Sequence, residues 1–396
     1  MSRVHIGCGT VYLDGWVNLD LPGPTTYLAS NRPDLVERWR TTEDKYFAKH
    51  SNASVETLRK PTAYQEYVCD RYANFDNLPF AAWSVSEILA RHAFEHLSIT
   101  EAHRALDQMD EVLKEGGLLR LDVPDHEGTL QEFKKTGDEF YIRHLLGPRR
   151  NDHGFHMMSY TRDRLRRLVE EHGFVFVKEE PNIHFYPAFC LRFIKPGLRP
   201  PCEYVELPPL PDHVQMLDVG PGPFPHPRAT HYLDLNPEHL KPMSDKGKST
   251  ILADLSTGLP RIESKRFDYV WCSHVLEHVD DPRKAASTLS RIAKRGTLVL
   301  PSVIKESLFN FEEADHQWLI LPAPNAEGPV FVRHNCEYMK AVKNIDVQRI
   351  TCRLFRSGPN RIDPEQRLLR SWYFRNEVHL DVIHHWEGEL RVQVIG

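Results

Sequence analysis

The sequence predicts an α/β protein made of two similar domains in tandem, each a mostly parallel sheet with helices on both faces. The chain has 396 residues, which is enough for two separate hydrophobic cores. A set of strand and turn residues occurs twice along it in the same order. Within each copy, strand-like stretches alternate with helix-like ones, and this alternation is typical of βαβ units.

Each copy begins with a short apolar strand that runs into two glycines. The first reads "RVHIGCG" and contains Gly7 and Gly9, and the second reads "MLDVGPG" and contains Gly220 and Gly222. Glycine allows a sharp turn and lets backbone N–H groups approach a ligand closely. A dinucleotide, a mononucleotide and S-adenosylmethionine would each suit such a turn, so the glycines alone do not choose between them.

Strands ending in aspartate follow in both copies. A dinucleotide site needs a third glycine three residues after the second, and Tyr12 and Pro225 stand there instead. The first acid of each copy can accept both hydroxyls of a ribose, and the second is placed to hold an adenine amino group. A cap or turn is the commoner role for a single aspartate after a strand. These acids are Asp20 and Asp70 in the first copy, and Asp234 and Asp254 in the second.

A third pair of matching stretches carries histidines. "SEILARHAFEHL" aligns with "DYVWCSHVLEHV", and further on "NDHGF" aligns with "ADHQW". If a helix starts at the end of each strand, residues three and four apart share one face and can converge. The polar residues involved are His92, Glu95, His96 and His153 in the first copy, and His274, Glu277, His278 and His316 in the second.

Helix signals follow each histidine motif. Ser98 and Glu101 have the spacing of a capping box, and Asp281 and Pro282 suit the N-cap and first position of a helix. We expect these helices to end at Gly116 and Gly296.

The domain boundary is expected in a proline-rich stretch. We predict a first domain over residues 1–195, a linker over 196–212 and a second domain over 213–396. The first copy also carries an insertion at about residues 22–66, with Pro33 at a plausible helix start. This insertion is either a lid over the ligand or a solvated excursion of the surface, and we favour the excursion.

The order of these motifs resembles the class I S-adenosylmethionine-dependent methyltransferases. The first copy is similar to short methyltransferases often found with bacterial glycan and secondary-metabolite genes, and the second to the broad small-molecule group. The resemblance implies two Rossmann-like domains, each with a seven-stranded sheet, and S-adenosyl-L-methionine as cofactor. It also implies that the cofactor contacts Gly7, Gly9, Asp20 and Asp70 in the first domain, and Gly220, Gly222, Asp234 and Asp254 in the second.

The histidines suggest O-methylation of a hydroxyl, and the resemblance to glycan-associated enzymes implies that the hydroxyl belongs to a sugar, a glycan or another small molecule. In one interpretation a histidine is the general base that removes the hydroxyl proton, and we take His92, His153, His274 and His316 as catalytic candidates. In the other, the whole set of His92, Glu95, His96, His153, His274, Glu277, His278 and His316 binds divalent metal. A third interpretation gives Glu-His only the role of orienting the helix.

Two rival functions stay open at this point. The proline-rich second loop around Pro223 offers few N–H donors, so one domain could be a degenerate scaffold beside a catalytic one. The spacing H-x-x-E-H also occurs in a class of zinc peptidases, although a peptidase would not need the glycine turns and aspartates.

The composition excludes several kinds of partner. The formal net charge of −5 provides no basic field for nucleic acid, and no N-P-P-Y motif follows the fourth strand. The seven cysteines form no C-x-x-C pair, which favours reduced thiols. We find no signal-peptide pattern and no stretch of about 18 apolar residues. We therefore expect a cytoplasmic enzyme with a small-molecule substrate, no membrane insertion and a homo-oligomeric state left open.

Overall fold

The computed structural model describes residues 2–45, 66–147, 155–184, 186–309, 316–322, 328–333 and 364–395. The chain divides into two compact units: unit 1 is Met1–Gly197 with Ser357–Ser371, and unit 2 is Leu198–Arg356 with Trp372–Gly396. Each unit has its own sheet, and the predicted α/β fold class is confirmed. Within the described ranges, no helix combines the length and apolar character needed to span a membrane.

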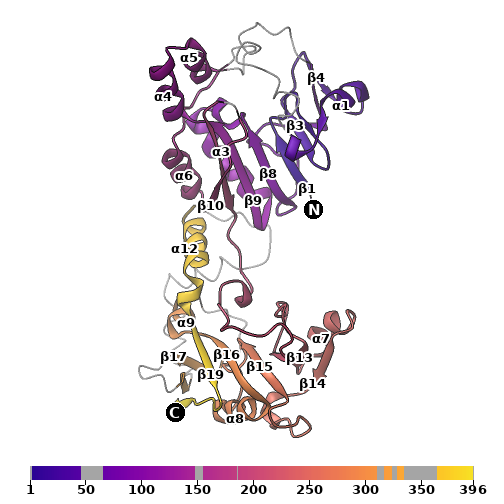
Figure 1. The fold of residues 1–396 in the computed structure, drawn as a ribbon, viewed down its shortest axis with the longest axis vertical. Coiled ribbons are helices and arrows are strands. Elements are labelled where there is room, and N and C mark those ends of the chain that lie inside the picture. Colours follow the sequence, from indigo (N-terminus) through magenta and orange to yellow (C-terminus); the bar gives the residue numbers. More distant parts are fainter. Residues whose placement is uncertain are drawn as a thin grey trace. The chain divides into compact units, whose positions relative to one another are not determined.

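The sheet of unit 1 has seven strands in the order β10-β11-β9-β8-β1-β3-β7 (Figure 1). The strands from β9 to β7 pair in parallel, whereas β11 and β10 pair antiparallel at the other edge. The strand bounds are β1 (Ser2–Ile6), β3 (Val17–Asp20), β7 (Arg71–Tyr72), β8 (Val85–Arg91), β9 (Leu113–Pro124), β10 (Val175–Glu180) and β11 (Ala188–Ile194).

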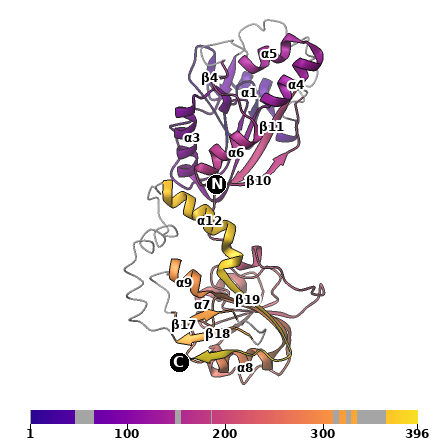
Figure 2. The same cartoon turned by 90° about the vertical axis from the view of Figure 1, so that its left-hand side faces the viewer.

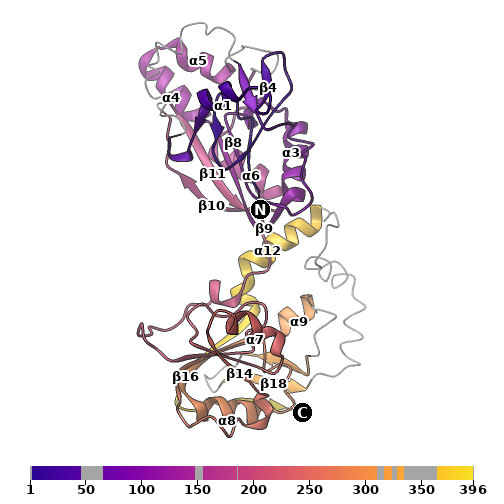
Figure 3. The ribbon, with the colours of Figure 1, turned by 90° about the vertical axis from the view of Figure 1, so that its right-hand side faces the viewer.

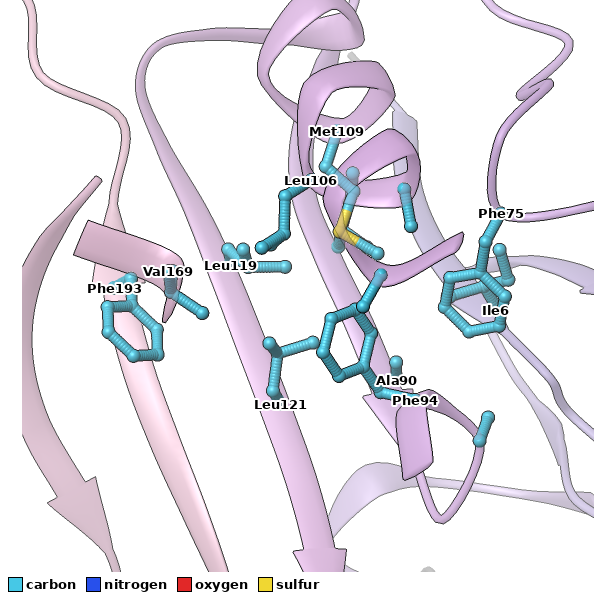
Figure 4. Packing of buried hydrophobic residues seen from close by; sticks show 14 of the residues in the cluster. Ile6, Phe75, Ala90, Phe94, Leu106, Met109, Leu119, Leu121, Val169 and Phe193 are labelled. Carbon is cyan, nitrogen blue, oxygen red and sulfur yellow. The ribbon is translucent and has the colours of Figure 1, made fainter. Parts of the chain in front are cut away.

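Two helices of unit 1 pack on one face of this sheet and share its apolar core (Figure 2). They are α3 (Ile99–Val112) and α6 (Arg162–Glu171). In Figure 4, Leu106 and Met109 of α3 lie over Leu119 and Leu121 of β9. This face can be apolar because alternate residues of each strand point toward it. Two more helices, α4 (His126–Thr136) and α5 (Glu139–Leu146), follow β9 in the chain.

Helix α3 begins at the predicted capping box but ends earlier than expected. The Ser98 hydroxyl accepts from the Glu101 N–H, and the Glu101 carboxylate accepts from the Ser98 N–H. The helix stops at Val112, and Gly116 lies inside β9 instead of closing the helix. The prediction for Gly116 was wrong because the chain turns directly into an extended strand at Leu113, without a left-handed cap.

The other face of the unit 1 sheet is charged. Alternate residues of the central strands, including Glu87, Arg91, Arg120 and Asp122, point away from the α3 core. Arg120 bonds Glu180 at 2.6 Å and Glu87 at 3.2 Å, although its side chain is only 5% exposed. Buried charges are tolerated only when they are paired, and here the pairing runs across three strands.

The insertion of unit 1 forms small elements beside the main sheet. They are β4 (Thr26–Leu28), α1 (Pro33–Trp39), β5 (Arg40–Thr41), η1 (Glu43–Lys45) and β6 (Tyr67–Cys69), and β5 pairs with β2 (Tyr12–Leu13). Pro33 stands in the first turn of α1, as its sequence position indicates. Strand β4 pairs with β6, so the described ends of the insertion are held together.

The sheet of unit 2 has six described strands in the order β14-β13-β12-β15-β16-β19. All neighbours pair in parallel except β19, which is antiparallel to β16. The bounds are β12 (Met216–Val219), β13 (His231–Asp234), β14 (Ser249–Leu252), β15 (Phe267–Ser273), β16 (Ala293–Pro301) and β19 (Asp381–Glu387). A separate three-stranded sheet joins β17 (Trp318–Leu321), β18 (Val330–Arg333) and β20 (Gln393–Ile395).

Both faces of the unit 2 sheet are apolar and covered. Helix α8 (Pro282–Ile292), capped by Asp281 as predicted, packs on one face, and α7 (Pro237–Ser244) packs on the other (Figure 3). Helix α8 ends at Ile292 rather than at Gly296, which lies in β16. Val205, from the proline-rich stretch, is buried in the same cluster as α7. The other helices described after residue 197 are η3 (Pro201–Glu203), η4 (Leu255–Thr257), α9 (Val303–Phe309) and α12 (Pro364–Leu380).

Candidate active site

The two glycine turns have the same backbone geometry and the same neighbour. Gly7, Gly9, Gly220 and Gly222 all adopt positive φ angles between 48° and 68°, which glycine reaches without strain. A Cβ on Gly7 would lie 2.4 Å from the Ala93 Cβ, and one on Gly220 would lie 2.3 Å from a methyl of Val275. The first glycine of each turn is therefore required, because a side chain there would collide with the turn that follows the neighbouring strand of the sheet, β8 or β15.

The second glycine of each turn faces open space. No atom of the described residues lies within 4 Å of the position that a Cβ would take on Gly9 or Gly222. Such a turn leaves room for a ligand beside the backbone at the carboxyl edge of a parallel sheet. This is the place at which the sequence predicts the cofactor.

The first acid of each copy lies beside its glycine turn. Asp20, at the end of β3, accepts a hydrogen bond from the Gly9 N–H at 2.7 Å. Asp234, at the end of β13, accepts from the Asn236 N–H at 2.8 Å and faces Nδ1 of His239 at 3.1 Å. Both carboxylates are thus fixed at the sheet edge, where a ribose could reach them.

The second acid of each copy has a local structural partner. Asp70 accepts from the Tyr12 hydroxyl at 2.5 Å and from the Asn18 N–H at 2.7 Å. Asp254 is exposed and caps η4 through the Ser256 N–H at 2.8 Å. Contact of Asp70 and Asp254 with adenine therefore stays a prediction. Sequence reasoning missed the bond from Tyr12, which it took only as an absent glycine.

The histidine motif begins with a strained residue in both units. His92 follows β8 with φ of 49°, and His274 follows β15 with φ of 53°. The N–H of His92 donates to the Asp122 carbonyl, and that of His274 to the Val299 carbonyl, both at 2.8 Å. A left-handed conformation in a residue other than glycine costs about 1–2 kcal/mol and often marks a functional site.

The expected helix start is a short turn in each unit. In unit 1 the residues after His92 form the 3₁₀ turn η2 (Phe94–His96), and in unit 2 they form an irregular turn. The ring of His92 still meets Glu95, with Nδ1 3.2 Å from Oε1, and His274 meets Glu277 at 3.3 Å. The strained backbone angle, and not helical spacing, is what turns each histidine back toward its glutamate.

A second histidine from a distant segment completes a group of three ligands in each unit. In both groups the candidate ligand atoms all lie within 4.8 Å of one another. His316 joins its group as the sequence predicts, whereas His153 lies outside the described residues and His156 stands in the group instead. The groups are Glu95, His96 and His156 in unit 1, and Glu277, His278 and His316 in unit 2.

In two of these histidines, the ring nitrogen Nδ1 has a hydrogen-bond partner on the side away from the group. The Nδ1–H of His96 donates to the Phe155 carbonyl at 2.8 Å. Nδ1 of His316 contacts the carboxylate of Glu306, a partner that sequence reasoning missed. Engagement of Nδ1 leaves Nε2 to bind, and metal-ligating histidines are oriented in this way.

The glutamates at the centre of both groups are buried and only partly bonded. Glu95 is 1% exposed and Glu277 is fully buried. Among the described residues, Oε2 of Glu95 and both carboxylate oxygens of Glu277 have no well-aligned hydrogen-bond donor, although Oε1 of Glu277 lies 3.3 Å from Nδ1 of His274. A buried carboxylate of this kind needs positive charge nearby. These oxygens face the histidines of the same group, so the arrangement can take a cation.

The charges around each glutamate keep it ionised. Burial opposes ionisation of Glu95, but its bond with His92 and the nearby His96 and His156 bring the pKa of Glu95 down to about 2. In unit 2, burial and Lys305 act to lower the pKa of His274, but Asp381 and Glu277 prevail and raise it to about 9.

Two models of known protein families match the parts of the chain that contain these turns. One family model described as a methyltransferase domain matches residues 4–121, and a second with the same description matches residues 203–388. Between them the two models include both glycine turns and both Glu-His turns. The chain belongs to the S-adenosylmethionine-dependent methyltransferases. Its two tandem methyltransferase domains are confirmed, and S-adenosyl-L-methionine is the cofactor of this family.

Several solved methyltransferase structures match about half of the chain. One from Methanosarcina mazei is 15% identical, with the match covering 49% of this chain and 91% of that chain at a TM-score of 0.30. A magnesium protoporphyrin IX methyltransferase from Synechocystis is 14% identical over 49% of this chain and 74% of that chain, at 0.28. One from Thermotoga maritima is 18% identical over 49% and 82%, at 0.26. No curated protein matches the chain.

Proposed function

We propose that both methyltransferase units are catalytic and methylate a hydroxyl of a sugar or another small molecule with the help of a divalent cation. The observation that carries this proposal is the repeated group of one glutamate and two histidines. It is assembled in both units from the same turn and from a second, distant segment. A scaffold unit would not need this group.

The donor set indicates the kind of cation. One carboxylate and two imidazoles suit first-row divalent ions such as zinc, manganese or iron, whereas magnesium prefers oxygen ligands alone. The unbonded oxygens of Glu95 and Glu277 supply the negative charge. His156 Nε2 lies 3.8 Å from Oε1 of Glu95, a separation that two ligands of one ion can have.

The cation groups lie next to the cofactor turns. Gly7 packs against Ala93, and Gly220 packs against Val275, each the residue directly after the strained histidine. Strands β1 and β8 are parallel neighbours, as are β12 and β15, so each pair of turns shares one carboxyl edge. This supports an acceptor bound between cofactor and cation.

The residues fit the cofactor, and we assign Gly9, Gly222, Asp20 and Asp234 to hold it. S-adenosylmethionine supplies an electrophilic methyl carbon on a sulfonium. In the transfer the acceptor oxygen would bond to the methyl carbon as the C–S bond breaks, S-adenosylhomocysteine would be the leaving group, and the hydroxyl proton would pass to solvent water. Binding to a divalent cation lowers the pKa of a hydroxyl, which eases that loss.

His92 and His274 are positioning residues in this proposal, in place of the general bases considered from the sequence. Nδ1 of each ring faces the glutamate of its own turn. Nε2 of His92 faces His184 and Tyr186, and Nε2 of His274 faces Asp381 at 3.7 Å. With polar partners on both sides, each ring is suited to hold its glutamate in place.

The proposal is tested by separating the two units. Asp234→Ala leaves unit 1 as the only active unit, and Asp20→Ala leaves unit 2. Each chain is incubated with labelled S-adenosylmethionine and a panel of sugar nucleotides and glycans, and products are read by mass spectrometry. We expect His156→Ala in the first background, or His316→Ala in the second, to lower turnover about 100-fold or more, and chelation to do the same.

Substitution of the exposed His213 by alanine is the matched control. Turnover that survives both chelation and the histidine variants would refute the proposal that a divalent cation takes part in the transfer. Turnover in only one background would identify the other unit as a scaffold.

A further inference from the structure

Three more side chains converge on the far side of His92 in unit 1. Asp122 comes from β9, and His184 and Tyr186 from the segment before β11. His92 Nε2 and His184 Nε2 are 3.2 Å apart, and His184 Nε2 is 3.0 Å from both Asp122 oxygens. The candidate ligand atoms of His92, Asp122 and His184 all lie within 4.8 Å of one another.

The hydrogen bonds among these groups fix which atoms face one another. If His184 Nε2–H donates to Asp122, the facing nitrogen of His92 must be a lone pair. The Tyr186 hydroxyl, 3.2 Å from that nitrogen, can donate to it. Two imidazole nitrogens and a carboxylate therefore point at one place. Two nitrogens bound at about 2.0–2.1 Å to a tetrahedral zinc ion lie about 3.3 Å apart, close to the spacing here.

Burial and support from behind also suit a metal site. The side chain of His184 is 1% exposed and that of Asp122 is 2% exposed. Nδ1 of His92 faces Glu95 at 3.2 Å, so a carboxylate lies behind the ring, as it does behind many metal-ligating histidines. Arg91 forms a loose ion pair with Asp122, with 3.7 Å between its Nη1 and Oδ2 of the carboxylate.

In unit 2, different residues surround His274, which is the equivalent of His92. The backbone partner of His274 is Val299, where the partner of His92 is Asp122. On the Nε2 side of His274, Asp381 lies at 3.7 Å, and Lys305 Nζ lies 2.7 Å from the same carboxylate oxygen. The lysine ammonium is a positive charge built into the chain. In the described part of unit 1 this place holds the histidine and a carboxylate, with Arg91 at 3.7 Å from the carboxylate where unit 2 has a lysine at 2.7 Å.

We propose that unit 1 holds an additional zinc-type cation site, formed by His92, Asp122 and His184, which unit 2 replaces with the ammonium of Lys305. The site takes a divalent ion that accepts nitrogen and oxygen ligands in tetrahedral geometry, with a water molecule or the Tyr186 hydroxyl as a further ligand. It is separate from the Glu95 group, and its existence does not rest on the proposed function.

The test is a titration of the full chain, first stripped with a chelator, with cobalt(II). Tetrahedral cobalt(II) absorbs visible light strongly, and bound ions are counted in parallel by elemental analysis. We expect His184→Ala to lower the count by one ion per chain and to remove the matching share of the visible band. Asp122→Asn, which keeps the shape of the side chain, should weaken binding of the same ion at least tenfold.

The variants must first give the circular dichroism spectrum of the wild type. His156→Ala, which removes a ligand of the other unit 1 group, is the matched comparison, and His213→Ala is the control for a histidine outside both groups. An unchanged ion count in both His184→Ala and Asp122→Asn would overturn the proposal. An ion count that falls in His184→Ala but stays unchanged in His156→Ala would refute the cation of the proposed function and leave this site in place.

Discussion

Unit 1 and unit 2 carry the same turns on sheets whose second faces differ. Where the face of unit 1 presents Arg120 and Asp122 on β9, the matching positions of unit 2 on β16 are Thr297 and Val299. The charged face is held by ion pairs that cross several strands. The apolar face is covered by α7 and by residues of the proline-rich stretch.

The comparison separates the features that both units keep from those that differ between them. Both units keep the glycine turn, the acid beside it, the strained histidine and the Glu-His-His group. All of these lie at the carboxyl edge of the parallel strands, where an open α/β sheet binds its ligands. The second face only has to be covered or paired, so it can change from ionic to apolar while the edge stays the same.

The largest expected effect is the loss of one cofactor site at a time. We expect calorimetry with S-adenosylhomocysteine to give close to two sites per chain. Asp20→Ala should abolish binding in unit 1 and Asp234→Ala should abolish it in unit 2, because each removes the carboxylate beside the glycine turn. A single site, lost entirely in Asp20→Ala, would show that the two edges are not equivalent.

The next effect concerns the stability that each first glycine provides. Gly7→Ala and Gly220→Ala should each lower the free energy of unfolding by about 2–4 kcal/mol, because the new methyl meets Ala93 or Val275 in addition to the backbone strain. Gly9→Ala is the matched control and should cost only the strain, about 1–2 kcal/mol. Urea unfolding without ligand measures the difference. Equal costs for Gly7→Ala and Gly9→Ala would contradict the close contact.

The smallest effect is an opposite pH dependence of the two units. Burial dominates the shift at Asp218 of β12 and raises its pKa to about 7, against the bond from the His226 N–H and with a small contribution from Asp234. Between about pH 4 and pH 7 the folded unit keeps a proton that the unfolded chain releases. Stability therefore falls as the pH rises across this window.

His5 of β1 has the matching place in unit 1 and the reverse behaviour. Burial lowers its pKa to about 4, against the bond with Asn18 and with a small contribution from Arg91. Because the unfolded histidine takes up a proton near pH 6.5, unit 1 loses stability as the pH falls from about 6.5 to 4. Asp218→Asn and His5→Gln should each remove most of this variation, because each replaces the titrating group with a neutral one.

Pulse proteolysis in urea at pH 4.5, 6 and 8, with mass spectrometry of the peptides, reads the two units separately. Profiles that change in the same direction for Asp218→Asn and His5→Gln would contradict the prediction.

The sequence predicted the edge of each sheet better than anything else. Local signals fix these features: glycines that need positive φ, the capping box of Ser98 and the cap of Asp281 are all readable in single stretches. The repeat then shows which of them belong together. The same short motifs also predict where the strands end and which family the chain resembles, because each motif lies within a single turn.

The parts that the sequence did not predict depend on long-range paths of the chain. His156 reaches Glu95 because the Met158 N–H donates to the Glu95 carbonyl, and no spacing rule gives that register. His184 meets His92 only through the antiparallel return of β11. A signal for the charged face was present, since Arg120 and Asp122 alternate with leucines in "LLRLDVP". A sheet buried on both faces would show no such alternation.

The left-handed backbone at His92 and His274 also shows that stability is given up at two positions where a side chain has to be placed. Glycine would adopt these φ angles without strain, so each histidine lowers the stability of the folded chain relative to glycine at the same position. Such a loss is common where a side chain is needed at one point in space and only a strained backbone can deliver it. A search for a more stable form of this enzyme would therefore find glycine at 92 and 274 early, and would remove the imidazoles that hold the two glutamates.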